Sequence, residues 1–239
     1  TSAPAALAVV LNERGHVDVD HVAELLHVTP EETIAELGEA IYRDPATGAW
    51  LTSDAYLSGA VRPKLAVAEG AAALDEAYRR NVEALRCVQP ADLRPSDISA
   101  RLGAPWIPAE DVVAFAKDVL EAEIGVHHTP EIASWTVDAR SLRWSAIGTS
   151  VFGTHRRDAG QLLSDALNSS IPQIFDTFRD ADGEKRVLNV VETETAKEKL
   201  TKIKEAFASW VWTAPDRTDR LARLYNDRFN NIVPRAFDG

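Results

Sequence analysis

The chain has 239 residues, enough for two ordinary domains or one large one. Its 45% hydrophobic and 26% charged residues are typical of globular proteins, and no apolar run approaches the length of a membrane-spanning helix. A single cysteine, Cys87, excludes internal disulfides and cysteine-built zinc sites, and we expect it in the core. Because no signal-peptide pattern opens the sequence, we expect a cytoplasmic protein without a membrane partner.

The net charge of −11 is unevenly distributed. Residues 1–62 carry three Lys and Arg against ten Asp and Glu, and residues 63–131 carry seven against twelve. Residues 132–239 carry sixteen against fifteen. Affinity for nucleic acid comes largely from neutralised phosphates, so only this last third is a candidate nucleic-acid surface. The sequence also contains no methionine, and we therefore expect a fragment or a processed product of a longer protein.

The first 62 residues predict a winged helix-turn-helix. The expected elements are, in order, a helix over 3–12, a strand over 16–19, helices over 22–26 and 30–40, and a hairpin over 42–51. Gly15 is suited to end the first helix. Thr29 and Pro30 are suited to the cap and the first turn of the third.

The helix over 30–40 is a poor DNA reader, although the second helix of such a module usually enters the major groove. It carries Glu31, Glu32, Glu36 and Glu39 and no Lys or Arg, so it repels phosphates. We favour a role in packing or in contacting a protein partner.

Residues 63–146 predict a second unit of similar order. Residues 66–88 have helical spacing and predict one long helix, which 89–92 break. In the stretch 94–108, Ser96 or Asp97 is suited to cap a short helix that Gly103 and Pro105 end. A helix over 109–123, a loop over 125–130 and short strands over 135–137 and 142–144 are expected to follow, which gives a second winged-helix-like unit over about 90–146.

The last segment, 147–239, predicts long helices. The expected elements are a helix over 158–168, hairpin strands over 172–178 and 185–190, a helix from Thr193 or Thr195 to Trp212, and a helix over 217–229. The expected fold is α+β and mainly α, with winged helix-turn-helix modules, short β-hairpins and long C-terminal helices in three segments, 1–62, 63–146 and 147–239.

Catalytic motifs are absent from the sequence. There is no phosphate-binding Gly-rich loop with Lys and Ser/Thr, and no Gly-x-Ser-x-Gly elbow. His127 and His128 are adjacent, and no acidic or cysteine ligand lies at a metal-binding spacing from them. We expect neither an enzyme nor a cofactor nor a bound metal.

The candidate DNA contacts all lie in the last third. They are Thr154, His155, Arg156, Arg157, Lys197, Lys202, Arg217, Arg220 and Arg228. The first four precede a helix whose free N–H groups, together with the hydroxyl and the guanidinium groups, favour an anion. The alternative is that all these charges form solvated faces. Trp144 and Trp212 could stack on bases, although tryptophans more often belong to the core.

Several motifs together resemble a known family. In chain order they are YLSGAVRPKL (56–65), NVEAL (81–85), RPSDISARLGAPWIP (94–108), GT (153–154), ALN (166–168), ET (192–193), KEAF (204–207) with Trp210, and YNDRFN (225–230). They resemble the region just ahead of the motor in very large bacterial, plasmid and phage proteins. In those proteins an adenine-specific DNA methyltransferase-like part is joined to a Swi/Snf-type superfamily-two helicase, and phage antirestriction proteins are relatives. The resemblance covers about residue 20 to the end, and Ala60 stands where a polar residue is more usual.

The resemblance implies a non-catalytic, DNA-engaging or coupling region. The helicase core would begin just beyond Gly239, and the ATP and methyl-donor sites would lie elsewhere in the parent protein. The implied partners are DNA, through the C-terminal third, and the methyltransferase-like and helicase parts of the same protein, in restriction, antirestriction or mobile-element defence. The alternative is a protein–protein adaptor that uses its acidic winged helix without direct DNA contact.

Overall fold

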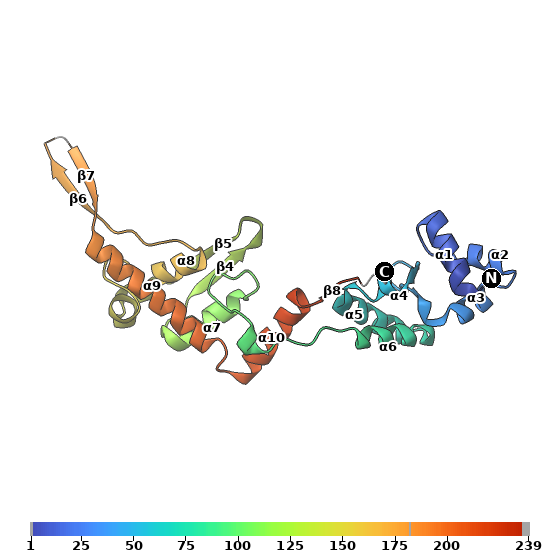
Figure 1. The fold of residues 1–239 in the computed structure, drawn as a ribbon. Helices are drawn as coiled ribbons and strands as arrows, with labels where there is room; N and C mark the ends of the chain where they lie inside the picture. Colours follow the sequence, from blue (N-terminus) through green and yellow to red (C-terminus); the bar gives the residue numbers. More distant parts are fainter. Residues whose placement is uncertain (1, 182, 236–239) are drawn as a thin grey trace. The chain divides into compact units, whose positions relative to one another are not determined.

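The computed structural model describes residues 2–181 and 183–235. It is 57% helical, and its strands form small antiparallel pairs, so the α+β, mainly α prediction is confirmed. The chain divides into two compact units, Thr1–Leu93 with Asn226–Gly239, and Arg94–Tyr225 (Figure 1). This division differs from the three predicted segments, because the chain leaves the first unit and later returns to it.

The first unit begins with a winged helix. Its elements are α1 (Ala3–Arg14), α2 (Val19–Leu26), α3 (Pro30–Leu37), the short 3₁₀ helix η1 (Gly38–Ala40), β1 (Ile41–Arg43) and β2 (Trp50–Thr52). Gly15 ends α1 in the left-handed region, at φ 72°. Thr29 caps α3 and Pro30 lies in its first turn, as predicted, and Glu32 completes a capping box with Thr29.

Residues 16–19 do not form the predicted strand. Asp18 instead caps α2 and accepts a hydrogen bond from the His21 N–H at 3.1 Å. Val10, Val22 and Ile41 are fully buried in the core of this module. The alternation that suggested a strand thus reflects a linker that buries Val17 and places the cap.

A helical pair completes the first half of this unit. It follows α4 (Ser53–Tyr56) and β3 (Gly59–Ala60), and consists of α5 (Val61–Ala72), the 3₁₀ turn η2 (Glu76–Tyr78) and α6 (Arg79–Cys87). The prediction of one long helix over 66–88 is wrong, because Asp75 caps η2 by accepting from the Ala77 N–H at 2.9 Å. The helices pack on each other, and Arg86 on α6 bonds Glu69 on α5. Cys87 is exposed rather than in the core.

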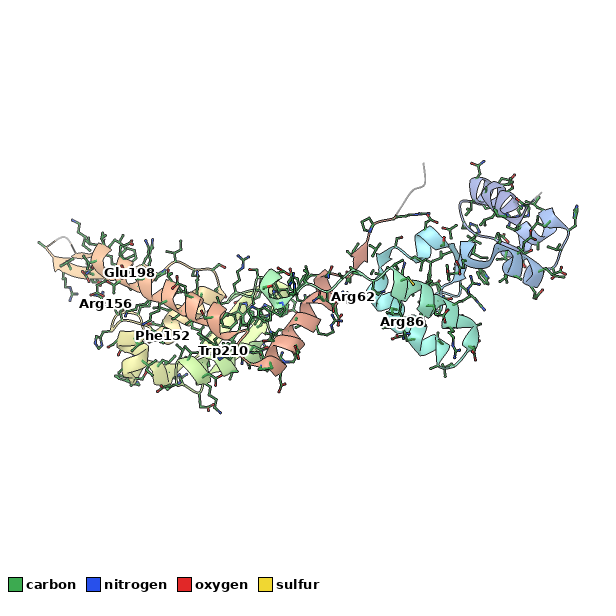
Figure 2. All side chains as sticks on the ribbon, turned by 60° about the horizontal axis from the view of Figure 1, so that its bottom comes forward. Arg62, Arg86, Phe152, Arg156, Glu198 and Trp210 are labelled. Atoms are coloured by element: carbon green, nitrogen blue, oxygen red, sulfur yellow. The ribbon has the colours of Figure 1, made fainter. Side chains whose placement is uncertain are left out.

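The chain returns to the first unit near its end. The strand β8 (Ile232–Val233) pairs with β3, and Arg62 donates to the Asn230 carbonyl at 2.7 Å and to Asp92 at 2.6 Å (Arg62 is labelled in Figure 2). Asn226 bonds the backbone of Leu93 in both directions. The segment after 226 is therefore part of the first unit.

The second unit contains the remaining elements. They are η3 (Pro95–Asp97), α7 (Ala109–Val119), β4 (Gly125–Thr129), η4 (Pro130–Ile132), β5 (Ser134–Asp138), η5 (Arg140–Trp144), η6 (Ile147–Val151), α8 (Ala159–Leu167), β6 (Phe175–Asp180), β7 (Gly183–Leu188), α9 (Val190–Trp210) and most of α10 (Pro215–Phe229). Of the η elements, η6 is a π-helical turn and the others are 3₁₀.

The second winged helix-turn-helix is not formed as predicted. The stretch 94–108 holds only the 3₁₀ turn η3, and the chain then runs on without the predicted helix. From Ile98 to Trp106, buried residues alternate with exposed or half-buried ones, as in an extended segment. The buried ones in that run are Ile98, Ala100, Leu102, Ala104 and Trp106, and Ile107 is buried next to them. Gly103 does take the expected left-handed φ, at 84°. The hairpin partner of β5 is β4, which was predicted as a loop, while 142–144 is helical rather than a strand.

The core of the second unit forms against α9. The predicted apolar face is buried; it consists of Ala196, Leu200, Ile203, Phe207 and Trp210. Phe115 on α7 meets Phe207 and Trp210 edge-on, with ring centroids 5.3 and 5.6 Å apart. The predicted hairpin is present as β6–β7 and projects from the unit in Figure 1. Asn189, and neither of the predicted threonines, caps α9.

Candidate nucleic-acid interface

The predicted anion-binding loop before α8 is closed on itself. Thr154 is buried, and its hydroxyl accepts from the Arg156 and Arg157 N–H groups at 3.2 and 2.9 Å. Asp158 and Gln161 form a capping box at the first turn of α8. The N–H groups that the sequence offers to an anion are therefore partly bonded by the chain's own side chains.

Arg157 bonds a buried carboxylate. Its Nε and Nη2 donate to Asp165 on α8 at 2.6 and 2.7 Å, in a two-pronged arrangement. The Asp165 side chain is only 8% exposed. The hydrogen bond to this carboxylate raises the pKa of Arg157 above its usual value. Arg157 thus has a structural role in holding its loop to α8.

Arg156 and His155 are the exposed members of this loop. Arg156 donates to Asp176 and to the Phe175 carbonyl, both at 2.8 Å, which places it at the base of the β6–β7 hairpin (Figure 2). This hydrogen bond lowers the pKa of Asp176. Both groups lie at the surface, where a phosphate can compete for the arginine.

The two predicted lysines on α9 have partners within the second unit, Lys197 on α9 itself and Lys202 on η6. Lys197 pairs with Glu194 at 2.8 Å. Lys202 donates to the Val151 carbonyl at 3.1 Å and lies 4.9 Å from the centre of the Phe152 ring. Lys199 also donates to the last carbonyls of η6, those of Ser150 and Val151. Lys199 and Lys202 therefore link α9 to the end of this turn.

The predicted arginines of α10 are largely structural. Arg217 lies 3.5 Å from the centre of the Trp210 ring and donates to the Trp210 and Val211 carbonyls at the end of α9. Burial lowers its pKa. Arg220 donates two hydrogen bonds to the buried Asp111, which raises the pKa of this arginine. Arg228 belongs to the first unit, where it is exposed beside Phe229.

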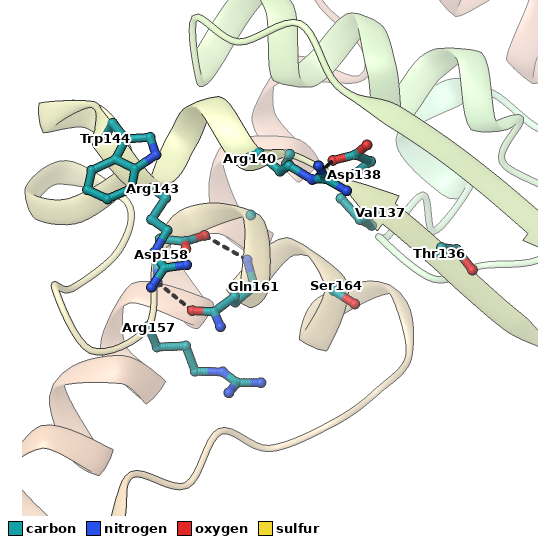
Figure 3. Close-up of a pocket in the computed structure, with 12 residues that line it drawn as sticks. Thr136, Val137, Asp138, Arg140, Arg143, Trp144, Arg157, Asp158, Gln161 and Ser164 are labelled. Carbon is teal, nitrogen blue, oxygen red and sulfur yellow. Dashed lines mark hydrogen bonds and ion pairs between the residues drawn. The ribbon is translucent and has the colours of Figure 1, made fainter.

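A different group of cations lines a pocket in the second unit. The pocket has a volume of about 660 Å³ and lies between β5, η5 and the start of α8 (Figure 3). Its lining includes the side chains of Arg140, Arg143, Trp144, Arg157, Gln161 and Ser164. Figure 3 shows Trp144 and Arg143 together at one end of it and Arg140 beside Asp138. Of the candidate DNA contacts, this pocket includes Arg157 alone.

The local sequence presents these residues outward. Residues three apart lie on the same side of a 3₁₀ helix, so Arg140 and Arg143 share one side of η5. Leu142 is fully buried and anchors the helix to the core. The Trp144 ring, by contrast, is 84% exposed. One apolar anchor thus fixes a short helix whose other large side chains face solvent.

Two glycines fix the position of η5. A Cβ at Gly148 would lie 1.8 Å from the Leu142 carbonyl oxygen, and one at Gly160 would lie 2.8 Å from the Ala139 Cβ. Side chains at these positions would collide with the backbone and side chain of the neighbouring elements. The close approach of η6 and α8 therefore fixes the backbone of η5, which carries Trp144 and the two arginines.

The charges leave Arg143 available. Arg140 and Asp138 form an exposed pair at 3.3 Å. Within the described part of the chain, no carboxylate is paired with Arg143, whose guanidinium lies 5.6 Å from the centre of the Trp144 ring. A flat exposed ring beside guanidinium groups can stack a base and bind its phosphate. As for other ligands, no group of three or more His, Cys, Asp and Glu among the described residues is placed to hold a metal ion.

The comparisons with known proteins agree with these units. Residues 101–231 match the family described as "Domain of unknown function (DUF8437)", over more than half of the chain. The chain belongs to this family. The DUF8437 match nearly coincides with the second unit and contains the whole Trp144 pocket.

A second match covers the winged helix. Residues 1–51 match the family described as "Probable helicase, winged helix domain", which spans α1 to β2. This match supports a helicase-associated region and confirms the winged helix ahead of the DUF8437 domain. No curated protein and no solved structure gives a significant match to the chain. None of the described helices is long and apolar enough to span a bilayer.

Proposed function

We propose that this chain is a non-catalytic nucleic-acid-engaging region of a helicase-containing protein, and that its second unit makes the contact. The observation that carries the proposal is the exposed Trp144 beside Arg140 and Arg143. The winged-helix match supplies the helicase context. The methyltransferase-like partner and the restriction, antirestriction or defence setting remain parts of the proposal that rest on the motif order.

The winged helix has the wrong charge for this contact. The helix α3 exposes Glu31, Glu32 and Glu36, and no cation lies within its bounds. A carboxylate row in the major groove would face the phosphates of both strands. We therefore assign nucleic-acid contact to the second unit and a protein or packing contact to the winged helix.

Salt-dependent binding of a labelled oligonucleotide to the full chain tests the proposal. Affinity should fall with salt by a slope of about −0.7 per contacted phosphate in a single strand or about −0.9 in a duplex. The double substitution Arg140→Glu with Arg143→Glu should weaken binding at least about tenfold, since each carboxylate replaces attraction by repulsion.

The control makes the same change of charge outside the lining of the pocket. Arg94→Glu with Arg101→Glu alters two exposed arginines of the same unit that do not line the pocket. Binding that is absent at low salt, or that falls equally in the test and control variants, would refute the proposal.

The rival function is an adaptor that contacts protein alone. It is favoured by the acidic surface of α3. In a pull-down with the helicase part of the parent protein, Glu31→Lys with Glu36→Lys should then abolish a nuclease-resistant interaction. Retention of the helicase by this variant, together with loss of oligonucleotide binding by the arginine variant, would favour the nucleic-acid role.

A further inference from the structure

We infer that the Trp144 pocket takes an unpaired nucleotide of a single strand, with its base stacked on the Trp144 ring and its flanking phosphates held by Arg140 and Arg143. The inference rests on the proposed function and specifies its ligand.

The exposure of Trp144 points to a flat ligand. A tryptophan buries a large apolar area when it packs, and Trp106, Trp135 and Trp210 of the same unit are each no more than 8% exposed. Trp144 is 84% exposed at the end of a helix that its neighbour Leu142 anchors. The fold thus presents the indole without using it in the core, and every nucleobase has a π-face that can stack on it.

Stacking on a side chain selects for single strands. In a duplex, both faces of each base are covered by neighbouring bases, so an indole reaches a base face only after unstacking it. In a single strand the faces are free, and stacking on an aromatic side chain has no such cost. A site built around an exposed indole therefore prefers a single strand to a duplex of the same sequence.

The pocket size and its polar lining fit a nucleotide. Its volume of about 660 Å³ lies within the usual range for small-ligand sites, about 300–1,000 Å³. The Gln161 carbonyl oxygen accepts from the Asp158 N–H, which leaves the amide N–H groups of Gln161 for a base edge. Ser164 adds a hydroxyl to the same lining.

The distribution of charge assigns the phosphates to Arg140 and Arg143. Asp158 lies in the lining, and Arg157 is bonded to Asp165, so these two lining residues offer little net positive charge to a phosphate. Arg140 and Arg143 are exposed on η5. With two phosphate contacts, the salt slope for a single strand should be shallow, about −1.4.

Fluorescence anisotropy with the full chain tests the inference. The ligands are a labelled single-stranded decathymidine, a duplex of mixed sequence with its separated strands, and an abasic decamer that keeps the phosphates but lacks bases. Trp144→Ala should weaken single-strand binding by about 5- to 150-fold, the range expected from one lost base stack. Trp144→Phe keeps a ring and should retain most of the affinity. The abasic decamer should bind wild-type protein about as weakly as decathymidine binds the Trp144→Ala variant.

The outcomes separate this inference from the proposed function. Because Trp144 is exposed, Trp144→Ala should leave the thermal unfolding midpoint unchanged, and a similar midpoint shows that the variant folds. If the chain binds duplex and single strands equally and Trp144→Ala loses neither, the inference is overturned while the proposed function stands. If thymidine monophosphate competes as well per molecule as decathymidine, the site takes a free nucleotide and the inference is likewise overturned. If no oligonucleotide binds at low salt, both fail.

Discussion

Replacing Arg157 distinguishes a structural role from a DNA contact. The sequence predicts this arginine as a DNA contact, whereas in the structure its Nε and Nη2 both donate to Asp165. The Asp165 side chain is 8% exposed and that of Arg157 is 28% exposed. Arg157→Ala would therefore leave a buried carboxylate without its partner.

The expected cost follows from this burial. Removing one member of a buried pair costs about 3–5 kcal/mol, and the partial exposure of Arg157 places this case near the lower end, about 3 kcal/mol. At about 2–4 °C per kcal/mol for a domain of this size, the unfolding midpoint of the second unit should fall by about 6–12 °C.

Thermal and urea unfolding measure this effect, with a double-mutant cycle as the control. Asp165→Leu combined with Arg157→Leu should cost less than the sum of the two single changes, because the double variant leaves no unpaired buried charge. A structural role for Arg157 is refuted if Arg157→Ala unfolds like the wild-type chain yet binds oligonucleotide more weakly. Arg157 would then be a nucleic-acid contact, as the sequence predicts.

Three further predictions concern other parts of the structure. Gly148→Ala should destabilise the second unit by about 1–3 kcal/mol in urea unfolding, because the added Cβ collides with the Leu142 backbone. The control Gly70→Ala should not be destabilising, because a Cβ at Gly70 has no atom within 4 Å. Arg220→Ala should lower the free energy of unfolding of the second unit by about 2 kcal/mol, because it leaves the buried Asp111 unpaired. Arg220→Lys should restore only part of this loss, since lysine cannot donate two parallel hydrogen bonds to the carboxylate. Equal stability of the wild-type chain and both variants would contradict the pairing. The backbone hydrogen bond from His21 lowers the pKa of Asp18 in the folded chain. The ionised cap therefore stabilises the winged helix fully at a pH above the usual Asp pKa of 3.8, and this stabilisation is lost as the pH falls through the lower pKa of the folded state. An acid titration followed by circular dichroism should show this loss for the wild-type chain and not for Asp18→Asn.

The predictable parts of the fold are those with local signals. The start of α3 is fixed by Thr29, Pro30 and Glu32, which act within one turn and can be read directly from the sequence. The buried face of α9 follows from its helical spacing over six turns. These signals need no knowledge of what the element packs against.

The predictions of local structure are wrong where packing against residues far away in the sequence determines the local conformation. In the stretch 94–108, apolar residues at every second position are buried against the core of the unit, and this outweighs the capping signals of Ser96 and Asp97. The break between α5 and α6 depends on Asp75 acting as a cap. In the sequence, Asp75 looks like any other acidic residue within a helical pattern, so the break cannot be predicted from it. Segment length alone favours one helix there.

The candidate site shows the same division. A sequence shows that Arg157 and Arg220 are charged, but it cannot show that their carboxylate partners lie 8 and 109 residues away. The two missed arginines, Arg140 and Arg143, did leave a signal. They lie three residues apart, with Leu142 between them and Trp144 directly after them. In this five-residue helix, Arg140–Trp144, Leu142 is the one aliphatic residue that can be buried in the core, so the arginines and Trp144 remain at the surface.

The pairing of β3 with β8 determines when the first unit can finish folding. The strands β3 and β8 are joined by a connection of more than 170 residues. The hydrogen bond from Arg62 to the Asn230 carbonyl spans nearly the same length of chain, so it cannot form before Asn230 is synthesised. During synthesis, all residues of the second unit leave the ribosome before Ile232 does. The second unit can therefore fold while the first still lacks its last strand, so the first unit, although it is synthesised first, is the last to be completed.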